Sequence, residues 1–472
     1  MPRKFNVAIS GSRDDFAHTH INDIGLQPAL HATTGEMGFN VVLGGYMSSK
    51  RVAESIDMNL WVPDKVAATI ELTTAILRIF RDEGERKDRQ KGRLMWLVEK
   101  YGEVKQVEMY PGESPHARCD PSYRDRILAE MASYGNGIEK LVDVQQPRPT
   151  GHFERRELNG IFPQPQPGLN RVGIHVPSGR LSVAEARQVA ELAEKYVPGA
   201  EIRLTVEENI ILPNVKDEDI GALCAEPALD RSKGARMSLN PGKICGNVVS
   251  CTGAQFCGLA MVETKNNAER IANELEKIVE VPKGIRIHWT GCPNSCGQVQ
   301  AADIGLMGGP AKKMNTEGVM KAVSGVIIFI GGTIGEHGKL QLEPAEMNGG
   351  AGSTGVPIED LVPVLTQIII DRFDGKIKPE FEEEQTVWQT AREKADAALQ
   401  AAAEAKAAAK AKSNTAATPA PKTTDPVAAA SQATQAAKLD VPKVKLEVAV
   451  VNNNQVPDSC VFRVVCVHIV PQ

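Results

Sequence analysis

The sequence predicts an α/β (α+β) fold in which two copies of one module flank a smaller half-domain. Three observations predict it. The chain matches itself at an offset of 280 residues, a strand–helix–strand–strand segment lies between the matching regions, and 472 residues suffice for two or three domains with their own cores. The net charge of −5 argues against nucleic-acid binding, and no apolar run reaches the length of a membrane span. We therefore expect a monomer that binds neither nucleic acid nor membrane.

The two copies occupy residues 1–141 and 241–384. Each contains a glycine, then Asp-Ile-Gly-Leu at the same distance, then an apolar strand that ends in Gly-Gly. The matching positions are Gly11 with Gly291, Asp23–Leu26 with Asp303–Leu306, and, after a short insertion, Gly44–Gly45 with Gly331–Gly332. A shared tetrapeptide alone is weak evidence, but the ungapped spacing indicates a duplicated module.

The first copy contains sequence patterns that are typical of strands and helices. Residues 5–10 alternate apolar and polar side chains, which predicts a strand, and the apolar run 40–43 before Gly-Gly predicts a buried strand. Residues 65–80 carry apolar side chains at helical spacing and predict a helix. Prolines and polar residues dominate residues 142–170, which we interpret as a linker.

Residues 171–240 read as a ferredoxin-like half-domain. The capping-box sequence Ser182-Val-Ala-Glu185 predicts the start of a helix that continues to about Tyr196. Strands are expected at 173–176, 201–205 and 209–213. Beyond the second module, residues 385–441 are expected to form an Ala-rich helix and a disordered linker, and residues 442–472 contain two β-prone runs without an assigned role.

Four of the nine cysteines fall between residues 251 and 296, which favours an intracellular metal site over a disulfide framework. They form two pairs, C-x5-C at Cys251 and Cys257 and C-x3-C at Cys292 and Cys296. Four thiolates in two pairs suit a cubane iron–sulfur cluster. Zinc is the alternative, although structural zinc sites usually use C-x2-C pairs.

The repeat indicates which copy holds this metal. Cys292 and Cys296 align with Ser12 and Phe16 in the first copy. Serine is a poor ligand for a soft metal and phenylalanine is none, so we expect the first module to lack a cluster and Ser12 to lie where Cys292 lies in the second. The first copy offers cations instead, Arg3 and Lys4, at the start of its first strand.

At this point the residues resemble a known family, the ferredoxin-dependent assimilatory nitrite reductases of the siroheme-containing nitrite/sulfite reductases. The resemblance covers about residues 2–376. It rests on Cys-Thr-Gly-Ala-Gln-Phe-Cys (251–257), His-Trp-Thr-Gly-Cys-Pro-Asn-Ser-Cys (288–296), Pro-Arg-Lys-Phe-Asn (2–6) with His-Ile-Asn-Asp (20–23), and Ile-Arg-Leu-Thr-Val-Glu-Glu-Asn (202–209). The related sulfite reductases share the architecture, but their cluster motif lacks the sequence Thr-Gly-x-x-Phe. The resemblance therefore favours nitrite as the substrate.

The resemblance implies a six-electron reduction of nitrite to ammonia at a siroheme bridged to a [4Fe-4S] cluster, with reduced ferredoxin as the electron donor. It implies that Cys251, Cys257, Cys292 and Cys296 ligate the cluster and that Cys296 is also the axial siroheme ligand. It implies catalytic and cofactor-binding roles for Arg3 and Lys4, and a cofactor-binding role for Asn6. Arg203 and Arg286 are further candidates for siroheme carboxylates, with a structural ion pair as the alternative for each.

Further expectations follow from the same resemblance. It places the protein in the plastid stroma, with the cytoplasm as the alternative. The first module begins at Arg3, already inside the family's active site, so we expect an N-terminal truncation, weak siroheme binding by this chain, and recovery on upstream extension. A sulfite reductase and a non-catalytic fragment that only binds the cluster remain the alternative functions.

Two other motifs have ordinary interpretations. His18 and His20 form an H-x-H pair, which we interpret as structural because no cysteine is near. The basic run Arg86, Arg89, Lys91 and Arg93 predicts an exposed helical face, with docking of an acidic ferredoxin as the alternative.

Overall fold

The computed structural model describes residues 4–12, 14–48, 51–101, 121–148, 156–314, 319–334, 339–345, 355–390 and 393. One compact unit contains the chain through Lys378, and the described residues from Pro379 onward belong to a second unit, in which residues 382–390 are helical. The predictions for residues 394–472, which include most of the expected Ala-rich helix, fall outside the described residues. In the part that is described, no helix is both long enough and apolar enough to cross a membrane.

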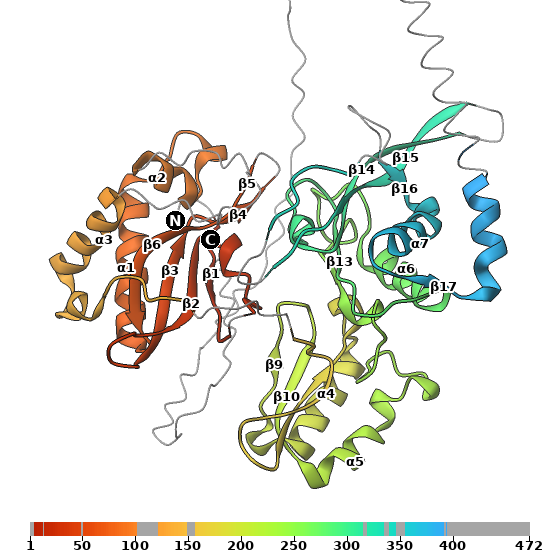
Figure 1. Cartoon of the computed structure of the whole chain (residues 1–472), viewed down its shortest axis with the longest axis horizontal. Coiled ribbons are helices and arrows are strands. Elements are labelled where there is room, and N and C mark those ends of the chain that lie inside the picture. Colours follow the sequence, from red (N-terminus) through yellow and green to blue (C-terminus); the bar gives the residue numbers. More distant parts are fainter. Residues whose placement is uncertain are drawn as a thin grey trace, which may run out of the picture. The chain divides into compact units, whose positions relative to one another are not determined.

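The first module is a four-stranded sheet that packs against three helices (Figure 1). The sheet order is β1 (Val7–Ile9), β2 (Ile24–Leu30), β3 (Met37–Leu43), β6 (Ile56–Pro63), and a small hairpin, β4 (Tyr46–Met47) and β5 (Val52–Ala53), follows β3. The helices are α1 (Val66–Glu83), α2 (Leu94–Tyr101) and α3 (Pro121–Tyr134). Their apolar faces and the sheet form one buried core, and the helix predicted at residues 65–80 is confirmed as α1.

The second module has a five-stranded sheet of the same kind. Its order is β11 (Val248–Ser250), β13 (Ile287–Thr290), β14 (Ile304–Met314), β15 (Met320–Ile330), β16 (Val356–Pro357). Its helices are α6 (Lys265–Ile278) and α7 (Leu361–Arg372), and β12 (Val279–Glu280) pairs with β17 (Lys376–Ile377). The strands β13 to β16 repeat the order of β1, β2, β3 and β6, and β11 is an additional edge strand.

The strand register confirms the duplication. Val7 pairs with Ile24 between parallel β1 and β2, and Ile287 pairs with Ile304 between parallel β13 and β14. In both modules the next strand is antiparallel and is followed by a glycine at φ 93°, Gly44 or Gly331. A 3₁₀ turn precedes the second strand in each copy. Sequence self-similarity therefore corresponds to one backbone built twice.

The two modules also touch each other through equivalent residues. His18 Nδ1 lies 2.5 Å from Gln298 Oε1, and these residues are separated by the repeat offset of 280. Ile21 and its equivalent Ala301 belong to one small apolar cluster. Both contacts join residues that occupy the same place in their own module.

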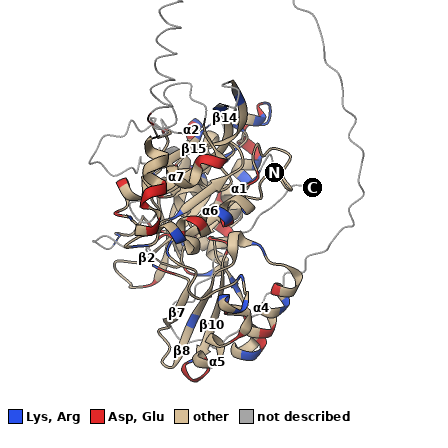
Figure 2. Cartoon of the chain, turned by 90° about the vertical axis from the view of Figure 1, so that its right-hand side faces the viewer, with Lys and Arg blue, Asp and Glu red and all other residues tan. Residues whose placement is uncertain are grey.

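The half-domain between the modules has the antiparallel sheet order β7 (Gly160–Pro163), β8 (Leu169–Ile174), β10 (Ile210–Lys216), β9 (Arg203–Leu204). Helix α4 (Val183–Tyr196) packs on it, and the predicted capping box is present: Glu185 N–H donates to Ser182 Oγ (3.2 Å), and Ser182 N–H donates to Glu185 Oε2 (2.7 Å). Helix α4 carries both acidic and basic residues (Figure 2), and the short helix α5 (Ile220–Cys224) follows β10.

The linker prediction for residues 142–170 is wrong at its C-terminal end. Residues 160–163 form β7, which pairs with β8 from Gly160↔Gly173 to Pro163↔Asn170. Proline is tolerated there because β7 is the edge strand, where a residue without a backbone N–H donor costs little stability. The proline-rich composition was therefore compatible with a strand.

The close approach of backbone at the repeated glycines gives a stability prediction. A Cβ at Gly305 would lie 2.1 Å from the Val299 carbonyl oxygen, whereas a Cβ at Gly221 in α5 would meet nothing within 4 Å. We expect Gly305→Ala to lower the free energy of unfolding by about 1–3 kcal/mol, as overpacking does. Gly221→Ala should instead raise it by about 0.5–1 kcal/mol, because a helical glycine loses more backbone entropy on folding. Urea unfolding of both variants measures this, and a stable Gly305→Ala protein would contradict the observed packing.

Candidate active site

Two neighbouring parallel strands place the first cysteine of each pair. β11 ends immediately before Cys251 and β13 ends two residues before Cys292, and Ser250 pairs with Trp289 between them. Cys251 N–H donates to the Trp289 carbonyl (2.9 Å), and Gly291 N–H donates to Cys251 Sγ (3.1 Å). Because the carboxyl ends of parallel strands lie at the same edge of a sheet, the two thiols come to one edge.

The second cysteine of each pair sits on a tight loop. Cys257 N–H donates to the Gly253 carbonyl (3.0 Å), and Gly253 has φ 71° with Thr264 Oγ1 only 2.4 Å from where a Cβ would lie. Cys296 follows Ser295, which has φ 53° and whose N–H donates to the Cys292 carbonyl (3.2 Å). Both loops thus turn their chains back toward the strand ends.

The four thiols are electrostatically coupled. Burial raises the pKa of the Cys296 thiol, the positive charge of Lys4 opposes this, and the charges of Cys251, Cys292 and Cys257 raise the pKa further. Cys296 is exposed and lines a cavity. A binding partner that carries positive charge into this group, as a metal cluster does, would convert all four thiols to thiolates.

The arrangement favours a cluster over a single ion. A structural zinc ion needs its sulfur ligands about 2.3 Å away in one tetrahedron. Within the described ranges, no group of three or more His, Cys, Asp or Glu side chains could hold such an ion. Two cysteine pairs that follow neighbouring strands, with charges that act on one another, suit an iron–sulfur cubane, which spreads its ligands over several irons.

A cavity of about 420 Å³ joins the two modules in front of Cys296. From the first module it is lined by Lys4 and Asn6, at the start of β1, and from the second by Cys296. Lys4 is exposed to the cavity, and Asn6 Oδ1 is buried without a hydrogen-bond partner in the described structure. The cavity has a volume typical of cofactor sites and combines a cation, an unsatisfied amide and a thiol.

The repeat shows how Asn6 comes to face this cavity. In the second module Arg286 donates its backbone N–H to Asp303 Oδ2 (2.8 Å) and its guanidinium to the same carboxylate (3.3 Å). In the first module Asn6, the equivalent of Arg286, makes the same backbone bond to Asp23 (2.8 Å). The guanidinium here comes from Arg93, whose Nη2 lies 2.7 Å from Asp23. Because Arg93 takes over the ion pair, the side chain at position 6 is available to the cavity.

None of the three arginines predicted to bind siroheme is seen at the cavity in the part of the chain that the structure describes. Arg3 lies outside the described residues. Arg286 makes the buried ion pair with Asp303, and Arg203 on β9 makes a partly exposed pair with Glu201 (2.6 Å); neither lines the cavity. The structure thus gives both residues the ion pairs that were the alternative interpretation, and a role toward siroheme carboxylates stays a prediction.

The first module fills the space where a cluster would lie. Phe16, at the position of Cys296, is buried, and Asp14 is completely buried in an ion pair with Arg156 (2.7 Å). Burial alone would raise the pKa of the Asp14 carboxyl, but hydrogen bonds from Arg156 and Ser12 and the charge of Arg156 hold that pKa below its usual value. Ser12, at the position of Cys292, hydrogen-bonds Asp14.

The structure also shows the contacts of the H-x-H pair and of the basic run. His20 Nδ1 contacts Asp15 Oδ2 at 2.9 Å and His18 Nδ1 contacts Gln298 Oε1, and these contacts fit the structural role expected of the H-x-H pair. In the basic run Arg86, Arg89 and Lys91 are exposed as predicted, but the segment contains the 3₁₀ turn Arg89–Lys91 and is not one helical face. The prediction was wrong for Arg93, whose side chain is 10% exposed because it binds Asp23, 70 residues away in sequence.

Several cavity residues were missed in the sequence. They are Asn22, Tyr46, Gln90, Arg93, Asn294 and Gln298. Gln298 had a signal, because it is the repeat equivalent of His18, and Asn294 lies between two predicted ligands. For Tyr46 and Gln90 the sequence carried no periodicity or spacing that would have selected them.

Comparison with known proteins supports these observations. Residues 1–114 and 242–377, more than half of the chain, match the family model described as the nitrite and sulphite reductase 4Fe-4S domain. Residues 162–229 match the nitrite/sulfite reductase ferredoxin-like half domain. A solved structure of the Mycobacterium tuberculosis NirA protein has the same fold, with a TM-score of 0.63 at 24% identity, over 79% of this chain and 60% of that one.

Two curated relatives are similar over most of this chain. The ferredoxin–nitrite reductase of Synechococcus elongatus is 42% identical over 380 residues, which are 80% of this chain and 65% of the relative. The chloroplastic ferredoxin–nitrite reductase of Zea mays is 42% identical over 386 residues, 82% of this chain and 60% of the relative. The chain thus spans less than two thirds of either relative. From the matching domains, the cysteine site and the duplicated fold, we conclude that the chain belongs to the nitrite and sulphite reductase family.

Proposed function

We propose that this chain reduces nitrite to ammonia at a siroheme bridged through Cys296 to a [4Fe-4S] cluster. Nitrite nitrogen is at oxidation state +3 and ammonia nitrogen at −3, so the reaction takes six electrons. The observation that carries the proposal is the cavity in which Lys4 and Asn6 of one module face Cys296 of the other. The relatives named ferredoxin–nitrite reductase support nitrite as the substrate.

The chain's own residues would position the cofactors and polarise the bound nitrite. Cys251, Cys257, Cys292 and Cys296 would hold the cluster, and Cys296 Sγ, at the cavity wall, would join it to the siroheme iron. The cofactor pair supplies the electrons and the metal centre that binds nitrogen. Lys4 would attract the nitrite anion and siroheme carboxylates and donate hydrogen bonds to an oxygen as it leaves, and Arg3 is proposed to act beside it.

The electron donor and the location are proposed with the same function. Reduced ferredoxin fits the names of the relatives. The plastid stroma fits the maize relative, which is named chloroplastic, whereas the Synechococcus name carries no such word, so the cytoplasm is the second candidate. Oxidation of reduced ferredoxin by the purified protein in the presence of nitrite tests the donor.

The cavity predicts how a charge change alters catalysis. We expect Lys4→Ala to raise the KM for nitrite at least about tenfold, the effect of one lost charge-assisted hydrogen bond, with Lys4→Arg recovering most of it. Lys283→Ala removes an exposed lysine at the corresponding start of the second copy and serves as the matched control. Nitrite consumption driven by reduced methyl viologen measures all three.

The same assay separates the alternative functions. The ratio of nitrite to sulfite consumption does not depend on how much cofactor the preparation retains. Faster sulfite consumption would identify a sulfite reductase. Consumption of neither, with no siroheme absorption band, would identify a non-catalytic protein that only binds the cluster. An unchanged KM in Lys4→Ala would remove Lys4 from the substrate site.

A further inference from the structure

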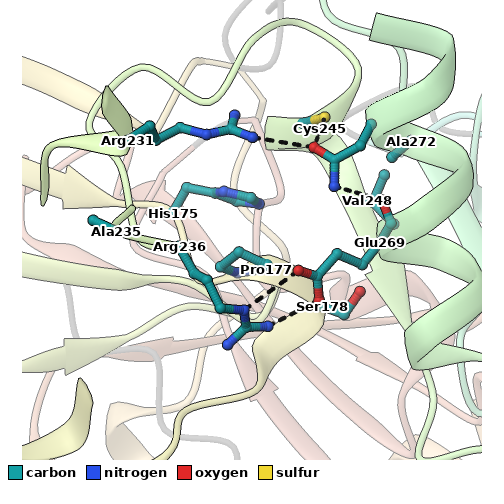
Figure 3. A pocket seen from close by; sticks show the side chains of 11 residues that line it. His175, Pro177, Ser178, Arg231, Ala235, Arg236, Cys245, Val248, Glu269 and Ala272 are labelled. Atoms are coloured by element: carbon teal, nitrogen blue, oxygen red, sulfur yellow. Dashed lines mark hydrogen bonds and ion pairs between the residues drawn. The ribbon is translucent and has the colours of Figure 1, made fainter. Parts of the chain in front are cut away.

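A second cavity, of about 110 Å³, lies where the half-domain meets the cluster-bearing module. His175, just after β8, and Arg231 and Arg236 line it from the half-domain, and Cys245 and Glu269 line it from the other side. Figure 3 shows His175 extending between the two arginines with Glu269 opposite. None of these residues takes part in the proposed nitrite chemistry.

His175 is buried and incompletely bonded. Its exposed fraction is 5%, and its Nε2 is buried without a hydrogen-bond partner in the part of the chain that the structure describes. The backbone of Cys245 favours the protonated form of the ring, but two larger effects oppose it. Burial first, and the charge of Arg231 second, lower the pKa of His175 to about 4. A neutral ring carries one N–H and one lone pair, so Nε2 is a hydrogen-bond acceptor in the tautomer whose proton is on Nδ1.

The two arginines beside His175 differ in the charge of the groups that they bind. Arg236 is engaged by two carboxylates, Glu269 at 2.8 Å and Glu185 at 3.1 Å. Arg231 has only neutral acceptors among the described residues, the Pro241 carbonyl at 3.3 Å and Asn273 Oδ1 at 3.1 Å. The cavity thus offers one uncompensated guanidinium together with two acceptors, His175 Nε2 and the Glu269 carboxylate.

We propose that this cavity is a binding site for a protonated oxyanion with the chemistry of hydrogen phosphate. The negative charge of the ligand would face Arg231, and its O–H would donate to His175 Nε2 or to Glu269. A fully ionised tetrahedral anion such as sulfate has the same size but no proton, and it would meet two acceptors that repel it. An unpartnered buried nitrogen otherwise costs stability, so a ligand that supplies its missing bond is favoured.

Equilibrium dialysis of the purified holoprotein tests the proposal. The probes are inorganic phosphate, sulfate and glycerol phosphate at neutral pH and matched ionic strength. We expect one phosphate bound per chain, at least about tenfold more tightly than sulfate, because a buried acceptor left without its donor costs that much. Binding of glycerol phosphate as tight as that of phosphate would identify the phosphate group of a larger molecule as the ligand, and its exclusion would identify the free ion.

Three variants locate the site. Arg231→Gln should weaken phosphate binding at least about tenfold through the lost charge-assisted bond. His175→Phe should reduce the preference for phosphate over sulfate, because Glu269 is then the remaining acceptor of the two. Arg187→Gln removes the same charge from an exposed position on α4 and should change neither. Binding that survives both cavity variants, or equal affinity for phosphate and sulfate, would overturn the proposal.

A measurement on the unaltered protein covers the case in which a variant fails to fold. Crystals soaked in arsenate, which is protonated like phosphate, should show an anomalous peak beside His175 Nε2 and Arg231, and crystals soaked in selenate should not. Water alone in this cavity after the arsenate soak would overturn the proposal. The result is independent of nitrite turnover, so a failure of the proposed enzymatic function would leave it standing.

Discussion

Cys296→Ser is expected to abolish stable cluster binding and the electronic coupling of siroheme to the cluster. Cys296 is the last cysteine of its pair, its thiol senses the charges of the other three, and it alone of the four borders the cavity that holds Lys4. Losing even an outer-shell partner of a metal ligand costs about 10- to 100-fold in metal affinity or activity, so loss of the shared ligand should cost at least about 100-fold in nitrite reduction.

Iron content and the visible spectrum measure this result. Iron per chain should fall, and the siroheme absorption bands should shift or disappear. Cys224→Ser, a change at an exposed free cysteine in α5, is the matched control and should retain parental iron and spectrum. A Cys296→Ser protein with an unaltered spectrum would remove Cys296 from the axial position, while normal iron content would remove it from the cluster.

Asp23→Ala is expected to be among the most destabilising single changes in the first module. Asp23 is fully buried and accepts both the Arg93 guanidinium and the Asn6 backbone N–H. Removing the carboxylate leaves a guanidinium that is 10% exposed without its counter-charge, which costs about 3–5 kcal/mol of the free energy of unfolding. The change also releases the start of β1, so nitrite affinity should fall with stability.

The control is an ion pair near the surface of the same module. Asp143, whose side chain is 48% exposed, pairs with His31 at 2.9 Å, and Asp143→Ala should cost no more than about 1 kcal/mol. The double variant Asp23→Ala/Arg93→Met removes both charges and should recover much of the loss measured by urea unfolding. Equal stability of Asp23→Ala and Asp143→Ala would show that the buried pair contributes little.

The sequence identified the features that local spacing encodes. The repeat offset predicted two copies of one module, and both copies have the same strand register, Val7↔Ile24 in the first and Ile287↔Ile304 in the second. The four cysteines were visible because each pair is local in sequence, and the order of β11 and β13 then brings the pairs to one sheet edge. The half-domain helix was visible through its capping box.

The rest depended on contacts between distant residues. The ion pair of Arg93 with Asp23 could not be predicted, because the two residues lie 70 positions apart and no local spacing connects them. β7 was hidden because edge strands tolerate proline, so composition did not separate strand from linker. Tyr46 reaches the cavity only because the β4–β5 hairpin folds beside it.

The contact of His18 with Gln298 has a consequence for how the two modules share the candidate site. Two equivalent residues can touch only near an axis of approximate two-fold symmetry, and the pairing of Ile21 with Ala301 in one apolar cluster places a second such point there. The interface between the modules is therefore of the isologous kind found between identical subunits of a dimer. A dimer of one module would carry two equal sites, each with a thiolate from one subunit and a cation from the other. In this chain Phe16 stands at the position equivalent to Cys296, and Gly284 at the position equivalent to Lys4. Each half therefore supplies one of the two side chains that meet at the cavity, and the equivalent place across the axis has neither.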